Sequence, residues 1–569
     1  MALRGLAARY LFRRSSYAPP KDPGPKKLFG RRAALAGVLF GATGYLVFSE
    51  QLPESAPLKD TPLAGIRTGG QGVLRSSRAI RAFVLNSLDY KYTLRDMDKM
   101  TDEYDELRAK VHQRSAKRIL QLCEKNTGTY VKAGQFLASL QGIPREYTQT
   151  LSVLQDQAKY QTFDKIDKVI AQELGSSATE IFAEFDPVPI AAASLAQVHR
   201  AVLKSTGQEV AVKVQYPGLQ QQFETDITTM HVLSKAIAWL FPEYQFTWLV
   251  PEFQSNLQKE LDFHEEGKNA ERAAANFAHR KDLKIPEVLW DHTTKRVLTM
   301  EFVHGCKISD RAAIERLGLN AQAVSSLLVE IFAEMVFCHA WVHADPHPGN
   351  ILVRQVGTAK KPRAEIVLLD HGLYRQIDER FRADFCQLWR ALVLQDRAKM
   401  KIYGDRLGAG DYYKYFPVIF TGRSFSSKSK LGEGMSDAER AALREEVRAF
   451  TMGDLSAFME RLPRDMLTVL RTDGLVRSIG RALGGDVRER LLINIKYAIL
   501  GANLSRGGNP DAQIRSWTSS IRVKYEYAQV RLRIALVEWV LRVRTIWSAF
   551  MSNFEKTVNT NMQAARIEI

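Results

Sequence analysis

The 569-residue sequence has few cysteines, and those it has are far apart. Its four cysteines, Cys123, Cys306, Cys338 and Cys386, include no Cys-x-x-Cys pair. Zinc sites and disulfide frameworks need cysteines at short, regular spacings. We therefore expect packed or free thiols in a reducing compartment, and neither a structural zinc nor a disulfide scaffold.

A strong positive charge is also missing from most of the chain. The net charge is +17, but residues 1–32 alone contribute +8, from six Arg and three Lys against the single acid Asp22. The remaining +9 is spread over the rest of the sequence, which shows no zinc-finger, homeodomain or RNA-recognition motif. These features argue against nucleic acid as a partner.

Long hydrophobic runs are absent except near the N-terminus. Residues 1–32 are rich in Arg and free of acids before Asp22, which is typical of a mitochondrial transit peptide, although a disordered basic tail has the same composition. Residues 33–48, AALAGVLFGATGYLVF, carry no charge. They are short for a span of about 20 residues, and a secretory signal competes, but we expect a single transmembrane anchor. The combination predicts a single-pass protein of the mitochondrial inner membrane.

The hydrophobic periodicity of the remaining chain predicts an α+β protein with two lobes. Residues 49–76 are rich in Pro, Gly and Ser and resemble a linker. Helical periodicity dominates 77–180, alternating strand patterns appear in 181–303, and 304–500 is mostly helical with one short β pair. Residues 501–569 predict amphipathic helices. A small β-rich lobe followed by a larger helical lobe is the order of a protein-kinase-like fold.

The run VHADPHPGNILV, residues 342–353, places Asp345 five positions before Asn350 and just ahead of an apolar strand. Phosphoryl transfer needs a carboxylate near the attacking hydroxyl and an amide oxygen on a metal ion. Kinases supply both from a D-x-x-x-x-N loop, with a His where His343 stands. Taken alone, the run could also be a metal site or a plain turn.

Twenty residues after Asn350, the run IVLLDHG places Asp370 directly after a β run. This is the position of the Asp-Phe-Gly aspartate of kinases, which binds magnesium. A strand that ends in an Asx turn has the same local pattern. Because it follows the first motif at kinase spacing, we predict that Asn350 and Asp370 hold Mg²⁺.

The run EVAVKVQY places Lys213 between apolar strand residues. A lone Lys in such a strand usually points to solvent, but Val-Ala-Val-Lys matches the lysine that holds the α- and β-phosphates of ATP. A downstream Glu should pair with it. Glu266 is the first choice and Glu260 the second, although Glu-rich helices are often simply solvated. Met300, Glu301, Phe302 and Val303 would offer their backbone to adenine.

Other kinase features are replaced. Where a glycine-rich loop would cover the phosphates, the chain has Ala191, Ala192, Ala193 and Ser194. An alanine Cβ hinders positive φ and close approach to phosphate, so Ser194 and backbone N–H groups would take over. Ala344 replaces the Arg of His-Arg-Asp, and no Ala-Pro-Glu follows Asp370. A docking segment for peptide substrates is therefore not expected.

With YVKAGQFLAS upstream, these departures resemble the UbiB/aarF-domain family of atypical kinases, and they look closest to a mitochondrial member. The resemblance spans about residues 95–400. Its motifs are the K-x-G-Q of Lys132, Gly134 and Gln135, the alanine-rich loop, the E-x-D of Glu260 and Asp262, and the Lys213, Asp345 and Asp370 runs.

The resemblance implies that the K-x-G-Q helices of the extension pack over the active site and point Lys132 into the nucleotide pocket. Glu260 and Asp262 would help to hold that closure. The alanine-rich loop is associated with nucleotide preference and with restraint of self-phosphorylation. Family members behave as ATPases tied to coenzyme Q or other mitochondrial lipid pathways, so membrane lipids or lipid-biosynthesis enzymes are the implied partners.

We therefore predict an atypical kinase-like enzyme, an ATPase or phosphotransferase with ATP (or another nucleotide) and Mg²⁺ as cofactors. In this mechanism Lys213 positions phosphates and Asp345 orients water or a hydroxyl. The alternatives are a nucleotide-gated scaffold without turnover, a true protein kinase, and a small-molecule kinase. The basic, amphipathic stretch from Arg515 to Phe554 could lie on an anionic membrane or pack on the large lobe, and the sequence favours neither.

Overall fold

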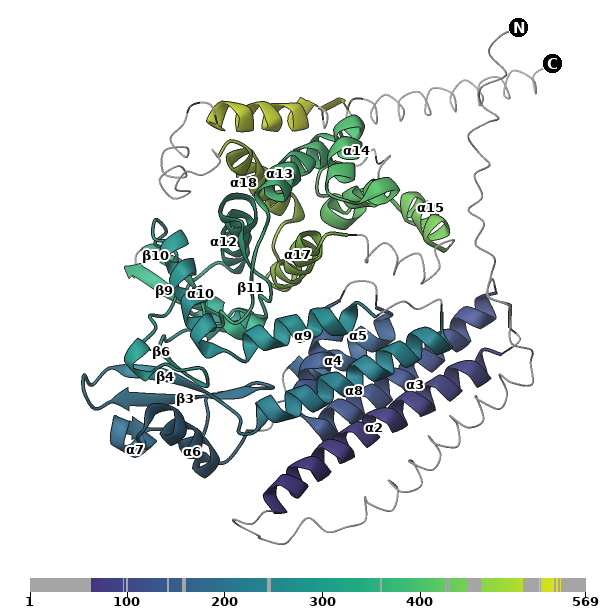
Figure 1. Ribbon diagram of the computed structural model, residues 1–569. Helices are drawn as coiled ribbons and strands as arrows, with labels where there is room; N and C mark the ends of the chain where they lie inside the picture. The colour runs from purple at the N-terminus through teal and green to yellow at the C-terminus, as the bar shows by residue number, and fades with distance from the viewer. Residues whose placement is uncertain are drawn as a thin grey trace, which may run out of the picture. The chain divides into compact units, whose positions relative to one another are not determined.

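The structure is a computed structural model, drawn in Figure 1. It describes residues 63–95, 97–98, 101–140, 143–155, 160–242, 247–358, 361–424, 427, 430–448, 462–504, 521, 523–536, 539–540 and 543. The predicted targeting segment and anchor, residues 1–48, lie outside the described residues. The chain divides into two compact units, Met1–Arg81 and Ala82–Ile569, and the second holds both lobes.

The predicted linker is wrong over its second half, because helix α2 (Leu63–Thr93) begins inside it. The prolines of the segment stop at Pro62, directly before the helix, so every later residue can donate its backbone N–H. The glycines of this helix, at 65, 69, 70 and 72, cost about 1 kcal/mol each relative to alanine. A weak propensity of this size is readily overridden in a helix of 31 residues.

Helices of the extension follow in the second unit. They are α3 (Asp102–Asn126), α4 (Thr129–Ser139), α5 (Arg145–Leu151) and the 3₁₀ turn η1 (Ser152–Gln155). Thr101 caps α3 by accepting a hydrogen bond from the Tyr104 N–H at 3.2 Å, and three acids in the first turn complement the helix dipole. Between α3 and α4 the backbone turns through positive φ at Thr127 and Gly128.

The N-lobe is built on one antiparallel sheet in the order β1-β3-β4-β6, with β2 on β3. Its strands are β1 (Phe182–Phe185), β2 (Ala191–Ala192), β3 (Ala196–Leu203), β4 (Glu209–Gln215) and β6 (Val297–Glu301). Val210, Val212 and Val214 of β4 are fully buried, as their alternation predicts, and they pack in one cluster with Ile166 and Ile170 of α6.

The helices of this lobe are α6 (Phe163–Leu174), α7 (Ala178–Ile181), α8 (Leu219–Leu240), α9 (Leu249–Glu260) and α10 (Phe263–Asn276). In Figure 1, α8 and α9 run beside α4 of the extension, and both contact it. Phe136 of α4 shares an apolar cluster with Phe223 of α8 and with Phe253 and Leu257 of α9. The extension therefore docks on the N-lobe helices through a buried apolar contact.

The C-lobe holds a second sheet in the order β5-β10-β9-β7 and a separate pair, β11-β8. Its strands are β5 (Leu283–Lys284), β7 (Cys306–Lys307), β8 (Trp341–His343), β9 (Ile351–Thr358), β10 (Lys361–Leu368) and β11 (Tyr374–Gln376). The predicted short β pair is the β9–β10 hairpin, which pairs Ile351 with Leu368 at the end farthest from its turn. This pairing sets the start of β9 beside the end of β10, where Asn350 and Asp370 follow.

Helices form the bulk of the C-lobe. Those described are α11 (Arg311–Arg316), α12 (Ala321–Glu334), α13 (Glu379–Leu394), α14 (Arg397–Arg406), α15 (Asp437–Arg448), α17 (Arg464–Ala482) and α18 (Val487–Ala502), with the short helical segments η3 (Met335–His339), η4 (Pro348–Asn350), η5 (Gly410–Tyr415) and η6 (Pro417–Thr421). The short turn η2 (Trp290–His292) precedes β6 and packs on that strand of the N-lobe. The helical run predicted directly after Asp370 is α13, so the chain has no long excursion between that aspartate and the next C-lobe helix.

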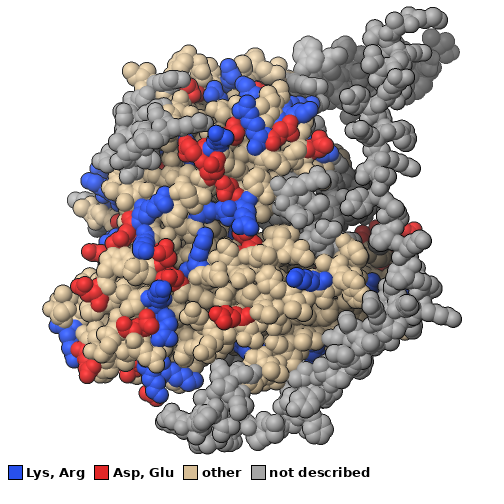
Figure 2. Space-filling view, in the orientation of Figure 1, with Lys and Arg blue, Asp and Glu red and all other residues tan. Residues whose placement is uncertain are grey.

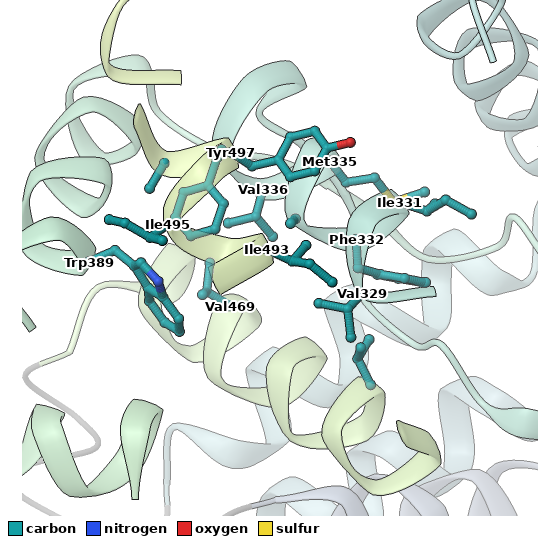
Figure 3. Close-up of a cluster of buried hydrophobic side chains, with 14 of the residues drawn as sticks. Val329, Ile331, Phe332, Met335, Val336, Trp389, Val469, Ile493, Ile495 and Tyr497 are labelled. Carbon is teal, nitrogen blue, oxygen red and sulfur yellow. The ribbon is translucent and has the colours of Figure 1, made fainter. Parts of the chain in front are cut away.

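Figure 3 shows the centre of the C-lobe, where α12, α13, α17 and α18 meet. Phe332 and Met335 pack there with Trp389, Val469 and Ile495, all nearly inaccessible to water. The stretch Ala321–His339 is apolar and long enough to cross a membrane, but 72% of that window is buried in the C-lobe. Its hydrophobicity is that of a core helix.

Candidate active site

Residues that are far apart in the sequence meet between the two lobes, at the place that we call the cleft. Lys213, on β4, donates to both carboxylate oxygens of Glu266, on α10, at 2.7 and 2.9 Å. The first-choice partner of the sequence analysis is therefore confirmed. Glu266 keeps only 2% of its side-chain surface exposed, so its role is to hold the lysine. Lys213 also lies 4.9 Å from the ring centre of Phe263.

Asp370 stands beside this pair, where the chain leaves β10. Its Oδ1 lies 3.8 Å from Lys213 Nζ and accepts the Gly372 N–H at 2.9 Å. Asn350, which ends η4, donates from Nδ2 to Asp370 Oδ2 at 3.1 Å. The β9–β10 hairpin explains the meeting, since it sets the residues that flank its two strands side by side.

The carboxylates differ in how far a ligand can reach them. The Asp370 side chain keeps 38% of its surface exposed, in contrast to Glu266. Burial works against its charge, but nearby Lys213, the Gly372 amide and Lys132 outweigh burial and hold the pKa of Asp370 well below its usual value. Asp370 therefore remains an ionised, accessible oxygen ligand at neutral pH.

The donor set at this point suits magnesium. The described residues contain no group of three His, Cys, Asp or Glu side chains that could hold a metal by themselves. Mg²⁺ does not need one, because it is usually held by one or two carboxylates together with water and substrate phosphates. Asp370 and the amide oxygen of Asn350 would provide two such ligands. Since the amide oxygen and nitrogen of an asparagine can exchange places by a flip, Asn350 could turn its oxygen to the metal.

Asp345 is anchored by an arginine that the sequence analysis missed. Arg471, on α17, lies 3.1 Å from Asp345 Oδ1. Burial works against the charge on Asp345, but the positive charges of Arg471 and Lys132 outweigh it and lower the pKa of Asp345. Arg471 is 126 positions from Asp345 in the sequence and lies in no recognisable motif, so only the packing of α17 against the catalytic loop could reveal it.

Two histidines shape the catalytic loop without facing a ligand. His343 accepts the Asp345 N–H at 3.1 Å, and burial lowers its pKa, so it is neutral at pH 7 and can accept. His347 caps η4 by accepting the Gly349 N–H at 3.1 Å. His347 occupies the position of a kinase catalytic lysine, but here it stabilises the turn that presents Asn350.

Lys132 of the K-x-G-Q motif reaches into the same cleft. Its Nζ lies 2.6 Å from Glu260 Oε2 at the end of α9. Burial works against its charge, yet Glu260, Asp345 and Asp370 raise the pKa of Lys132 above its usual value. Lys132 therefore lies near Asp345 and Asp370, which is consistent with the position that the resemblance implies. Glu260, the second choice as partner of Lys213, instead binds Lys132.

The other K-x-G-Q residues hold α4 in place. Gln135 donates from Nε2 to the Leu154 carbonyl at 2.8 Å. A Cβ on Gly134 would lie 2.4 Å from Leu154 Cδ1 and 3.0 Å from Cys123 Sγ, distances that a well-packed core does not tolerate. Glycine at 134 is thus explained by the close approach of α3 and η1 to α4.

Asp262 does not join the closure expected of it. Its side chain accepts the His264 N–H at 3.0 Å and caps α10. Because this cap fixes the start of α10, it also positions Glu266, which lies in the first turn of that helix. Glu260 therefore holds the closure, and Asp262 orients the helix that holds Lys213.

The alanine-rich loop forms a tight turn at the edge of the N-lobe sheet. Ala191 and Ala192 pair with β3, and the Ala193 N–H donates to the Ala196 carbonyl at 2.8 Å. The Tyr216 hydroxyl donates to the Ala193 carbonyl at 3.0 Å. Ser194 is largely buried, so only a small part of its surface is available to a phosphate.

The segment from Met300 to Val303 covers the last two residues of β6 and leads toward the C-lobe. The Met300 side chain is buried with Ala196 and Phe263. The Glu301 N–H donates to the Glu287 carbonyl at 2.8 Å, and the Phe302 N–H donates to the Glu209 carbonyl at 3.3 Å. Both amides are thus engaged within the protein, which favours Val303 among the four predicted residues for an adenine contact.

Comparison with known proteins agrees with this geometry. A family model described as the ABC1 atypical kinase-like domain matches residues 153–403. The mouse protein AarF domain-containing protein kinase 1 is 40% identical over 481 residues, which cover 84% of this chain and 90% of the mouse chain. The chain belongs to the ABC1/AarF family of atypical kinases. A Drosophila melanogaster relative, AarF domain-containing kinase 1, is 37% identical over 417 residues, 72% of this chain and 80% of its own.

Among solved structures, the complex of Rv3197 with erythromycin from Mycobacterium tuberculosis aligns with a TM-score of 0.44 and 22% identity, over 68% of this chain and 97% of that one. Membership of the ABC1/AarF family confirms the family resemblance and the kinase-like fold expected from the sequence. It also places the chain among kinase-type enzymes, whose fold is suited to ATP and Mg²⁺ in general.

Proposed function

We propose that this ABC1/AarF protein is an Mg²⁺-dependent ATPase or phosphotransferase that acts in mitochondrial lipid or coenzyme Q homeostasis. The observation that carries the catalytic part is the convergence of Lys213, Asp370 and Asn350 on one accessible point of the cleft. The ammonium of the lysine and a Mg²⁺ ion held by the other two residues would together offset the negative charge of a triphosphate.

Each residue has a role in this proposal. Lys213, fixed by Glu266, positions the α- and β-phosphates, and the backbone at Val303 receives adenine. Asn350 and Asp370 would hold Mg²⁺, whose charge would offset the charge that develops on the phosphates. Asp345, kept ionised by Arg471, orients a water or hydroxyl toward the terminal phosphate. Positioning and charge neutralisation account for the catalysis.

The lipid part of the proposal rests on the N-terminal segments and on the family. A transit-like segment at 1–32 and an apolar run at 33–48 would place the enzyme at the mitochondrial inner membrane. Lys132, paired with Glu260, and α4 would close the side of the cleft where a protein substrate would otherwise enter. A small or lipid-borne acceptor, or water, suits this closed arrangement better than a peptide.

The decisive experiment is phosphate release from ATP by the full chain with and without Mg²⁺. Asp370→Asn removes the charge that binds the metal and should lower Mg²⁺-dependent release by about 100-fold or more. Asp405→Asn, the same change on an exposed position of α14, serves as the control and should release phosphate at the original rate. Unchanged release by Asp370→Asn would remove this mechanism.

A second candidate, the nucleotide-gated scaffold, is favoured by one observation. Asp345 is paired with Arg471, and Lys132 contributes positive charge beside both Asp345 and Asp370. The charges of these two carboxylates are therefore balanced by residues of the protein, so the site does not need a catalytic role to explain them. A protein that is stabilised by ATP in thermal denaturation but releases no phosphate would support the scaffold and contradict the enzyme.

A further inference from the structure

The C-terminal helix has two apolar faces, and only one of them is covered. Residues 523–536 form a continuous helix, with further helical residues at 521, 539, 540 and 543; it is the yellow helix at the top of Figure 1. Val523, Val530 and Ile534 are buried in the C-lobe core, and Tyr527 packs against it. The predicted alternative of packing on the large lobe is therefore confirmed for this face.

The opposite face carries a second apolar stripe, which we call the outer stripe. At about 100° per residue, Tyr525, Leu532 and Leu536 of the continuous helix lie on the side roughly opposite Val530. The outer stripe consists of these three and the other exposed apolar side chains of the described helical residues, which are 44% to 84% exposed: Ile521, Tyr525, Leu532, Leu536, Trp539, Val540 and Val543. So many large apolar side chains in one line on the surface mark a contact site.

Exposed cations flank the outer stripe on both sides. Lys524 and Arg531 project on one side and Arg533 on the other, as the helical period dictates. On the face shown in Figure 2, by contrast, basic and acidic side chains of the described residues are interspersed. An apolar stripe bordered by Lys and Arg is the pattern of helices that lie in the interface of a membrane with anionic lipids.

A pocket of about 400 Å³ opens next to this stripe, and Leu536 contributes to both. It lies between the C-terminal helix, the end of α13, the start of α14 and the segment around Arg423. Cations outnumber acids in its wall, where Asp396 is the one acidic residue among the described ones, and the cationic members are Arg390, Lys399, Arg423, Lys430 and Arg533.

Some of these cations already have carboxylate partners. Arg390 lies 3.7 Å from Glu526, Lys399 lies 3.2 Å from Asp396, and Lys430 lies 3.2 Å from Glu433. Arg533, an exposed residue of the C-terminal helix, adds a further cation to these paired ones. Guanidinium and ammonium groups suit an anion with hydrogen-bond acceptors, and the volume of the pocket is within the usual range for a small-ligand site.

We propose that this surface docks on an anionic membrane. The outer stripe enters the boundary between headgroups and acyl chains, and the basic pocket receives the phosphate of an anionic phospholipid. The charge of the pocket and its continuity with the stripe through Leu536 favour a lipid over a protein partner, since a phospholipid presents a phosphate and apolar chains in that same arrangement. The docking site is separate from the cleft and does not depend on the proposed enzymatic function.

The test uses the full chain with an environment-sensitive fluorophore at Ala528→Cys, an exposed position beside the outer stripe. The protein is mixed with phosphatidylcholine vesicles, with or without phosphatidylglycerol, that contain nitroxide lipids as quenchers. The fluorophore reports contact of this helix with the bilayer, whether or not residues 33–48 also insert. We expect quenching at about tenfold less lipid when phosphatidylglycerol is present.

Paired variants separate the two parts of the site. Lys399→Gln with Arg533→Gln should remove most of the preference for anionic vesicles, and Leu532→Ser with Leu536→Ser should weaken quenching by about tenfold on all vesicles. The matched control is Val232→Ser with Trp239→Ser, which removes comparably exposed apolar side chains from α8 and should leave quenching unchanged.

Several results would overturn the proposal. The fluorophore could remain unquenched on anionic vesicles, or quench equally in the Lys399 and Arg533 variant. A signal that follows protein concentration without lipid would mark the stripe as an interface between copies of the chain. Loss of quenching on addition of inorganic phosphate at constant ionic strength would assign the pocket to the free anion.

Discussion

Two lysine–glutamate pairs occupy the same cleft but join different regions of the molecule. Lys213 and Glu266 link β4 to α10 within the N-lobe, whereas Lys132 and Glu260 link α4 of the extension to α9. Glu266 is almost inaccessible, and Glu260 is partly exposed. The first pair prepares a cation for a ligand, and the second fastens a helix over the site.

The difference teaches that one kind of ion pair can serve ligand binding or closure, according to what surrounds it. Lys213 is 3.8 Å from the accessible carboxylate of Asp370, so a bound phosphate and metal would meet it directly. Lys132 is backed by a helix whose Gly134 and Gln135 are packed against η1. Removing each lysine should therefore damage a different property, and four experiments can break or sharpen this distinction.

The largest effect is expected from Lys213→Met. Loss of the ammonium leaves the phosphates without their fixed cation, so ATP affinity should fall by about 100-fold. The shift of the thermal denaturation midpoint with ATP concentration measures it. Lys284→Met, which breaks the more exposed Lys284–Glu301 pair, should keep the original affinity. An equal loss in both variants would deny Lys213 its special role.

Lys132→Met should mainly cost stability. It leaves Glu260 partly buried beside Asp345 and Asp370 without its cation, and breaking such a pair should lower the free energy of unfolding by roughly 2–4 kcal/mol. Urea denaturation measures the change, and adding Glu260→Gln should restore part of it. If ATP affinity instead fell as far as in Lys213→Met, the two pairs would share one function.

Gly134→Ala tests the packing of α4 alone. The new Cβ would press against Leu154 Cδ1 at 2.4 Å, and we expect a loss of about 1–3 kcal/mol in the free energy of unfolding. The control is Gly70→Ala, a helical position with no atom within 4 Å of the added Cβ, which should stabilise by up to about 1 kcal/mol. In a Leu154→Ala background, the loss of unfolding free energy caused by Gly134→Ala should be smaller, because the methyl group that the new Cβ would meet is gone. A Gly134→Ala protein with the same free energy of unfolding as the wild type would show that α4 is loosely held.

The smallest effect is a pH dependence from Glu266. Burial raises its pKa to about 7, from an ordinary value of 4.5. Between these values the folded protein binds a proton that the unfolded chain does not, so this residue should make the free energy of unfolding fall as pH rises from about 4.5 to 7. The pKa of Lys213 is raised above its usual value, so the lysine stays charged throughout.

The measurement compares wild type with Glu266→Gln by denaturation at several pH values. The difference between them should change by about 1–3 kcal/mol across that window. Because Glu260 pairs with a different lysine and its pKa is also raised by burial, Glu260→Gln is the informative companion. Parallel curves for wild type and Glu266→Gln would contradict the assignment.

The cleft illustrates which parts of a site can be predicted from a sequence. Lys213, Asp345, Asn350 and Asp370 stand in short runs whose spacing is set by strand and turn geometry, so their convergence was predictable. Their backbone neighbours decide where they lie: the β9–β10 register places Asn350 beside Asp370. Glu266 was selected from a short Glu-rich segment because a helix downstream of β4 had to supply a carboxylate.

Other contacts were not predictable for a physical reason. Arg471 meets Asp345 because α17 packs on the catalytic loop, and nothing local to Arg471 signals this. Asp262 lies in the same motif as Glu260, but the turn between α9 and α10 makes it a helix cap. The linker predicted at 49–76 gave way to α2 from Leu63 onward, because glycine content is only a weak signal.

The sequence by itself determined the chemistry of this protein: a lysine in a buried strand, an aspartate and an asparagine five apart, and a second aspartate after an apolar run. These follow from patterns within a few residues, where strand alternation and turn geometry act directly. Only the tertiary structure decided which lysine pairs with which glutamate, that Arg471 holds Asp345, and which face of the C-terminal helix stays exposed. Such choices depend on packing between segments from about fifty to more than a hundred residues apart, and no local pattern encodes that packing.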